Sequence, residues 1–184
     1  MRVLGIDLGV NNTGFVLVDI NGNMKVVYSE VYSPKSDVPE NLFKEAKKKG
    51  RRGELKLLDY RIEYEYLTSL FEKTKSLIRK FKPDAVVVEK PDVRPIFPRR
   101  TQVVLFMLYS TVLLATSRSK VDFASYTKST VNKIIGIKSS KSYKERKKEI
   151  IERYKNVEFD VKKGKLDHVA DALAVIEAYT KSKN

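Results

Sequence analysis

The stretch between residues 165 and 174 reads Lys165-Leu166-Asp167-His168-Val169-Ala170-Asp171-Ala172-Leu173-Ala174, and it decides the architecture to expect. His168 and Asp171 are three residues apart and Asp167 and Asp171 are four apart, so either pair shares one face of a helix. The residues that follow are small or apolar, which is typical of a helix packed against a sheet. The alternative is an ordinary helix start, with Asp167 as N-cap and acids favoured by the helix dipole.

The composition predicts one folded domain with a strong positive charge. The chain has 184 residues, of which 42% are hydrophobic, and no cysteine, which excludes disulfides, thiolate metal sites and thiol nucleophiles. The net charge of +14, from 37 basic and 23 acidic residues, favours nucleic acid as a partner. A thermophile surface rich in lysine and glutamate would be balanced in charge, and no basic helix with an exposed apolar face indicates a membrane. Without a signal peptide or a membrane span, we expect a cytoplasmic protein associated with nucleoid or viral DNA.

Apolar runs and turn signals predict an α/β fold with a five-stranded mixed sheet flanked by helices. The first three strands form an antiparallel meander, with the hairpin signal Asn21-Gly22, and the other two pair in parallel. Nothing marks a second domain, so we expect a single domain over 1–184 with a basic insertion at about 33–53, either a solvated loop or an arm that grips DNA. The expected strands span 2–8, 13–20, 24–32, 85–89 and 121–125, and the expected helices span 55–81, 98–117, 126–135, 140–154 and 166–181.

Two further acids end apolar strands. Asp7 and Glu89 stand at the carboxyl ends of the first and fourth strands, where an α/β sheet exposes side chains to a crevice. If these strands are neighbours, the two acids lie side by side, and the last helix adds His168 and Asp171. Taken singly, Asp7 is also a turn-forming acid before a glycine, and Glu89 an ordinary strand-end acid paired with Lys90.

Three carboxylates and an imidazole in one place repel one another unless divalent cations neutralise them. Oxygen ligands without thiolates suit Mg²⁺ or Mn²⁺. Two such ions, about 4 Å apart, activate a water and stabilise a leaving 3′ oxygen. In a strongly basic chain, this pattern indicates phosphodiester hydrolysis.

Four segments, in the right order, resemble the RuvC family of Holliday-junction resolvases, which belongs to the RNase H-like superfamily. They are Gly5-Ile6-Asp7-Leu8-Gly9, Thr13-Gly14-Phe15, Val86-Val87-Val88-Glu89 and His168-Val169-Ala170-Asp171-Ala172-Leu173-Ala174. The resemblance implies an RNase H-like fold and a Mg²⁺-dependent homodimer. Such a dimer would bind a four-way DNA junction and nick two strands of like polarity symmetrically, without a nucleotide cofactor or a membrane.

Carried over by position, the resemblance makes Asp7, Glu89 and Asp171 metal ligands and catalytic residues. His168 falls where most members have an aspartate, and Asp167 is the alternative ligand because one helical turn presents both near Asp171. A lysine-bearing segment ahead of the last helix implies phosphate contacts, and a proline-rich segment after Glu89 lacks the family's nearby stacking aromatic. The DNA-contact candidates are Lys133, Lys141, Lys144, Phe97, Arg99 and Arg100. One basic helix start could track a phosphate backbone with Lys141, Lys144, Arg146, Lys147 and Lys148, and a solvated helix face is the alternative for Lys147 and Lys148.

Three other functions remain open. The segment Gly5-Ile6-Asp7-Leu8-Gly9 also resembles the first phosphate loop of actin-like and Hsp70-like ATPases, but that fold needs two such domains and 184 residues are too few. Another RNase H-like nuclease is a closer alternative, either an RNA-processing enzyme, which usually lacks an acid like Glu89, or a transposase-type domain, which usually carries further DNA-recognition domains. A non-catalytic nucleic-acid-binding module is the third, although a degenerate copy would be expected to lose at least one acid.

Overall fold

The structure is a computed structural model that describes residues 1–33, 52–92, 99–137 and 142–183, apart from the side chains of residues 52–63, 99, 100 and 163. The basic insertion predicted at about 33–53 therefore lies outside the described residues, except at its two ends.

Five strands form one mixed sheet in the order β3-β2-β1-β4-β5. The strands are β1 (Arg2–Asp7), β2 (Thr13–Asn21), β3 (Asn23–Tyr32), β4 (Ala85–Lys90) and β5 (Asp122–Thr127). The first three are antiparallel, whereas β4 runs parallel to both β1 and β5. This confirms the predicted sheet. Gly22 lies between β2 and β3 with a φ of 85°, a conformation that glycine adopts at no steric cost, as the hairpin signal predicted.

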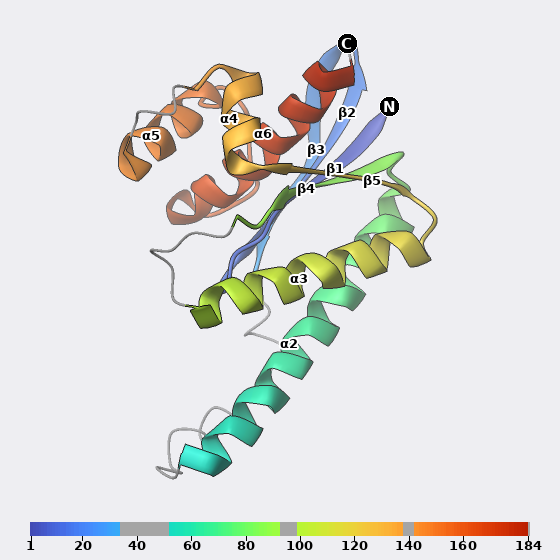
Figure 1. Cartoon of the computed structure of the whole chain (residues 1–184). Coiled ribbons are helices and arrows are strands. Elements are labelled where there is room, and N and C mark those ends of the chain that lie inside the picture. Colours follow the sequence, from blue (N-terminus) through green and yellow to red (C-terminus); the bar gives the residue numbers. More distant parts are fainter. Residues whose placement is uncertain (34–51, 93–98, 138–141, 184) are drawn as a thin grey trace.

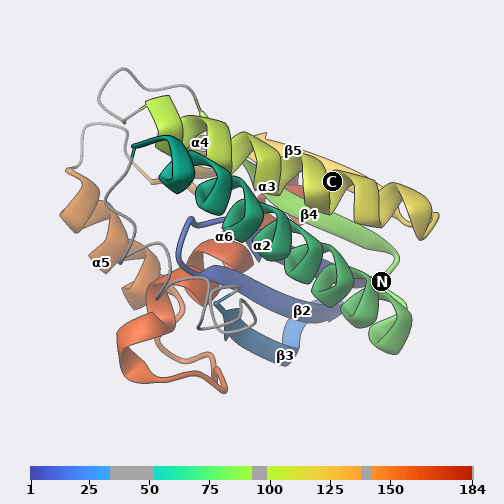
Figure 2. The ribbon, with the colours of Figure 1, turned by 90° about the horizontal axis from the view of Figure 1, so that it is seen from below.

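Helices cover both faces of the sheet (Figure 1). One face carries α2 (Arg52–Phe81) and α3 (Arg99–Arg118), which lie side by side when viewed from below (Figure 2). The other face carries α4 (Lys128–Ile135), α5 (Tyr143–Arg153) and α6 (Leu166–Lys183), with a short 3₁₀ turn (Lys163–Lys165) leading into α6. Within the described ranges, no helix combines the length and the apolar character that crossing a membrane requires.

The sheet is apolar on both faces because both are covered. Along β1, successive side chains point to opposite faces. Val3 therefore packs with α4, α5 and α6, while Leu4 and Ile6 pack with α2 and α3, and all three side chains are fully buried. This double burial explains why β1 and β4 are continuous apolar runs that end in an acid.

The boundary difference that matters for the site falls at the end of β5. The strand was expected to end at residue 125 and the next helix to begin at residue 126. Instead, Tyr126 and Thr127 continue the strand by pairing with Glu89 and Lys90. Thr127 then caps α4, since its hydroxyl accepts a hydrogen bond from the backbone N–H of Thr130. The helix therefore begins at Lys128.

Candidate active site

Parallel pairing brings three strand ends to one edge of the sheet. Asp7 is the last residue of β1, Glu89 lies at the end of β4, and Lys128 follows directly after β5. Ile6 pairs with Val88, which sets the first two strand ends side by side. A cavity of about 300 Å³ opens there, and its lining includes Asp7, Glu89, Lys128, Tyr143, Lys147, His168 and Asp171.

Two glycines let α6 lie directly on the sheet. A Cβ atom on Gly5 would stand 2.5 Å from the backbone oxygen of Ala172, and one on Gly14 would stand 2.3 Å from that of His168. Both distances are far below van der Waals contact, so any larger residue would push the helix away. This close approach puts the first turns of α6, with His168 and Asp171, beside the end of β1.

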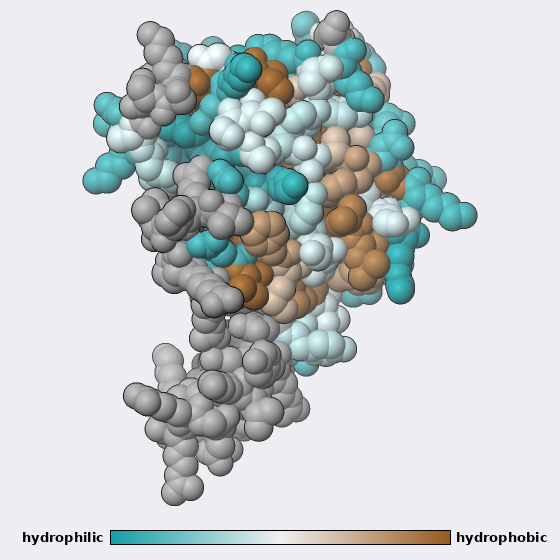
Figure 3. Space-filling view, viewed as in Figure 1, coloured by the Kyte–Doolittle hydropathy of each residue, from teal (hydrophilic) through white to brown (hydrophobic). Residues whose placement is uncertain are grey.

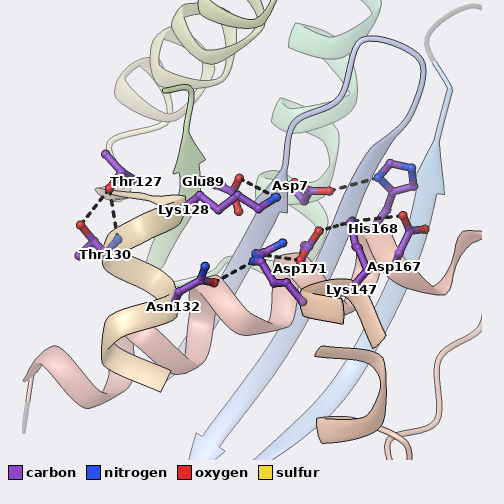
Figure 4. A network of polar contacts seen from close by, with 11 residues as sticks. Asp7, Glu89, Thr127, Lys128, Thr130, Asn132, Lys147, Asp167, His168 and Asp171 are labelled. Atoms are coloured by element: carbon purple, nitrogen blue, oxygen red, sulfur yellow. Dashed lines mark hydrogen bonds and ion pairs between the residues drawn. The ribbon is translucent and has the colours of Figure 1, made fainter. Parts of the chain in front are cut away.

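Asp7 and His168 form one half of the polar network in Figure 4. The Nδ1 atom of His168 lies 3.1 Å from Oδ2 of Asp7, and the Asp7 residue is only 8% exposed. The hydrogen bond with the Asp7 carboxylate raises the pKa of His168 above its usual value. The pair fixes the imidazole ring at the cavity wall.

Asp171 forms the other half and is held by two cations from α5. Its carboxylate accepts a hydrogen bond from Arg146 at 3.3 Å and a shorter one from Lys147, and the residue is 1% exposed. The Arg146 guanidinium also donates to Asn132 at 2.9 Å. Burial would lower the pKa of Lys147, but the Asp171 carboxylate outweighs it, so the pKa is raised and the lysine is charged.

Asp167 contacts the same lysine from the exposed side. It accepts a hydrogen bond from Lys147 at 3.1 Å, and its side chain is 33% exposed. Burial would raise the pKa of Asp167, but Lys147 and His168 outweigh it and the pKa is lowered. Asp167 is not an N-cap, because it lies inside the first turn of α6, which continues from the 3₁₀ turn.

Glu89 is the least compensated acid. Its Oε1 atom lies 3.7 Å from the Lys128 ammonium, a loose ion pair, and its buried Oε2 atom has no hydrogen-bond partner. Burial, above all, raises the pKa of Glu89 to about 7. A buried carboxylate oxygen without a partner is costly, so Glu89 is poised to accept a cation or a proton.

The donor set fits a hard divalent cation. Asp7, Glu89 and Asp171 supply carboxylate oxygens, the ligands that suit Mg²⁺ or Mn²⁺, and His168 adds an imidazole nitrogen. The side chains are turned toward the chain's own cations, and in the described part of the chain no three acidic or histidine residues are arranged to hold one ion. Binding an ion at Asp171 therefore requires Lys147 to move from that carboxylate.

The candidate DNA-binding residues are only partly described. Lys133 and Lys144 are exposed, on α4 and α5. Arg99 and Arg100 are the first residues of α3, with side chains outside the description, and Phe97 and Lys141 lie outside the described residues altogether. The placement of Lys148 on an exposed face is confirmed, but that of Lys147 is wrong, because this side chain is only 14% exposed and lies in the cavity.

Sequence reasoning missed several residues of the site. Lys128 was missed because β5 was expected to end at residue 125. Lys128 lies directly after the end of β5, just as Asp7 lies at the end of β1. Arg146 was taken as part of a DNA-tracking surface but is 6% exposed and bound to Asp171. The sequence did indicate this position, because Arg146 lies four residues before the apolar Ile150 and therefore on the same face of α5, which is buried.

Comparison with known proteins places this geometry in a known fold. No family model and no curated protein sequence matches the chain. RuvC from Thermus thermophilus is similar in structure, with a TM-score of 0.69, 18% identity, and coverage of 100% of this chain and 95% of that chain. The same protein in complex with a Holliday junction substrate gives a TM-score of 0.67 at 17% identity, with the same coverage.

More distant matches come from a virus and a fungal organelle. The fowlpox virus Holliday junction resolvase gives a TM-score of 0.55 at 16% identity, over 100% of both chains. The yeast mitochondrial Holliday junction resolvase gives 0.51 at 20% identity, over 97% of this chain and 77% of that one. At such identities the likeness shows a shared fold, which is the RNase H-like fold predicted from the sequence.

Proposed function

We propose that this chain is a structure-selective DNA endonuclease that resolves four-way (Holliday) junctions by paired, metal-dependent nicks in strands of like polarity. The observation that carries the proposal is the meeting of Asp7, Glu89, His168 and Asp171 around one cavity in a chain of net charge +14. The similar solved structures support it, since they are Holliday-junction resolvases and one of them is bound to a junction. We propose one nuclease domain over residues 1–184, acting on nucleoid or viral DNA in the cytoplasm.

The four residues are the proposed ligands of Mg²⁺ or Mn²⁺, and we expect two ions per active site. Such an ion polarises the scissile phosphate and lowers the pKa of the attacking water. Glu89 offers the carboxylate oxygen that has no hydrogen bond. Asp7 holds the imidazole of His168 in a fixed orientation through the 3.1 Å hydrogen bond. Arg146 and Lys147 hold the Asp171 carboxylate at the cavity through two ion pairs.

The DNA surface follows from the charge. Lys133 and Lys144 are exposed on the two helices nearest the cavity and are proposed to contact phosphates. Lys141, Phe97, Arg99 and Arg100 remain proposed contacts from the sequence. Replacing one phosphate-contacting lysine should lower the slope of log K against log salt by about one unit, because one fewer counterion is released.

Paired nicks need two active sites, so we propose a homodimer built on α3. An open groove of about 590 Å³ runs along this helix, and hydrophobic side chains gather over it in Figure 3. On the same helix, Val103 in the groove and Leu114 beyond it are 51% and 50% exposed, which is costly for a monomer surface. The groove is lined by Leu67, Gln102, Val103, Phe106, Met107 and Ser110. A second copy of the chain would cover these side chains and supply the second nick.

The test is an incubation of the full chain with labelled four-way junction, duplex, flap and RNA–DNA hybrid, each with Mg²⁺ or with EDTA. We expect symmetric nicks in two strands of the junction, with Mg²⁺ only. Asp7→Asn should abolish the nicks and leave junction binding nearly unchanged, because the basic surface carries the affinity. Cleavage of the hybrid alone would favour an RNA-processing nuclease, and binding without cleavage a non-catalytic module. Normal nicking by Asp7→Asn would refute the ligand assignment.

A further inference from the structure

Tyr143 is an exposed aromatic residue at the rim of the acidic cavity. It is the first residue of α5, is 63% exposed, and lines the cavity together with Asp7 and Glu89. Its backbone is fixed by a capping box: Ser142 accepts a hydrogen bond from the Glu145 N–H at 3.3 Å, and Glu145 accepts one from the Ser142 N–H at 2.8 Å. The ring is therefore presented to solvent from a well-defined helix start.

Two lysines hold this ring. The Nζ atoms of Lys128 and Lys147 lie 5.6 and 5.7 Å from the ring centroid, within the range of cation–π attraction. Both lysine side chains are mostly buried, at 17% and 14% exposed. Lys128 faces Glu89 and Lys147 faces Asp171, so each ammonium lies between a carboxylate and the aromatic ring.

An aromatic ring flanked by two ammonium groups suits a nucleotide. The ring can stack on any base, and each ammonium attracts a phosphate on the adjoining backbone. A purely structural role would be to cover the aliphatic stems of the two lysines. The structural role needs apolar surface but no aromatic ring. Replacing Tyr143 by an aliphatic residue therefore preserves the structural role and removes the stacking.

Resting on the proposed nuclease function, we propose that Tyr143 stacks on a nucleobase next to the scissile phosphate, with Lys128 and Lys147 contacting the flanking phosphates. The three residues form a nucleotide-binding rim that sets which phosphate enters the cavity. Tyr143 is thus a specificity-determining residue and takes no part in the bond-breaking step.

The experiment uses the full-length Asp7→Asn protein, which should bind junctions without cutting them, and junctions with 2-aminopurine beside the phosphate that the unmodified chain nicks. Stacking on Tyr143 should quench the 2-aminopurine fluorescence on binding. Tyr143→Phe should keep the quenching and the affinity. Tyr143→Leu, which retains apolar cover over the lysines, should lose the quenching and weaken binding about tenfold, as expected for one stacked base.

Tyr64→Ala is the matched control, since this tyrosine is 67% exposed on α2 and does not line the cavity. It should bind and quench as the parent does. Quenching and affinity in Tyr143→Leu equal to those of Tyr143→Phe would overturn the inference, as would an equal loss in Tyr64→Ala. Failure of the unmodified chain to nick any junction would instead overturn the proposed function, so the two failures are separable.

Discussion

Replacing Lys147 by methionine tests the central electrostatic feature of the site. The substitution keeps most of the side-chain volume and removes only the ammonium, which hydrogen-bonds to both Asp171 and Asp167. Asp171 is 1% exposed, so its carboxylate loses a partner that water cannot replace. Removing one partner of a buried ion pair costs about 3–5 kcal/mol, and the remaining Arg146 should reduce this to about 2–3 kcal/mol.

The effect should appear in thermal unfolding without divalent cations. For a chain of this size, about 1 kcal/mol shifts Tm by roughly 2–4 °C, so Lys147→Met should lower Tm by roughly 4–12 °C. The raised pKa of Lys147 means that the pair's contribution is present below the ordinary value of 10.5 and is lost only as pH rises above it, so pH 7 is a suitable condition. Lys155→Met is the control, because Lys155 and its partner Glu152 are 59% and 69% exposed and such surface pairs contribute little to stability.

Adding Mg²⁺ should reverse the loss. In the unmodified chain an ion at Asp171 must displace Lys147, whereas in Lys147→Met the carboxylate has only Arg146 beside it. The variant should therefore bind Mg²⁺ more tightly in calorimetry and gain more Tm from it, since stabilisation grows with the ratio of ligand concentration to Kd. A variant that melts within 2 °C of the unmodified chain (roughly 1 kcal/mol by the same scaling) and responds equally to Mg²⁺ would refute the reasoning.

Three further predictions concern the frame around the site. Glu177→Gln should destabilise the fold by about 2 kcal/mol at pH 7 in urea unfolding, because Glu177 accepts hydrogen bonds from the Arg153 guanidinium of α5 and from the Tyr154 hydroxyl just after it. The pKa of Glu177 is lowered to about 2, so the difference from the unmodified chain should shrink as pH falls from the ordinary 4.5 toward 2, and a constant difference would contradict this. Gly14→Ala should cost about 1–3 kcal/mol by overpacking against α6, whereas Gly164→Ala, with open space around it, should be nearly neutral in the same assay. Val103→Glu should convert the proposed dimer to a monomer in sedimentation and remove the pairing of nicks, and an unchanged mass would exclude α3 as the interface.

The positions of the acids were predictable because they depend on local patterns. A strand buried on both faces is a continuous apolar run, and its carboxyl end is where a polar side chain first becomes tolerable. Asp7 and Glu89 follow this rule. Because β1 and β4 are parallel neighbours, the two acids meet at one edge of the sheet, as expected. The expected boundaries of α6 were close to those observed because its small and apolar residues reflect contact with the sheet.

The cations were not predictable in the same way. Lysines and arginines at the start of α5 look alike in sequence, and which of them turns inward depends on how that helix packs on α6. Arg146 and Lys147 turn inward and Lys144 and Lys148 outward. From the sequence, only added metal ions were expected to neutralise the acids, whereas Arg146 and Lys147 of the chain itself pair with Asp171. Lys128 was missed for a different reason, since β5 extends two residues beyond Ser125, where the strand was expected to end.

The pairing of carboxylates with internal cations bears on how folding depends on metal ions. Small zinc-dependent domains cannot fold until their ion arrives, because the free energy of metal binding supplies their folding free energy. Here Asp171 has Arg146 and Lys147, and Asp7 has His168, so the chain carries its own counterions from synthesis onward. Under the proposed function, folding would therefore not depend on ion supply. A newly made molecule would stay folded through magnesium scarcity, and binding the ion would require only an exchange of partners inside a formed pocket.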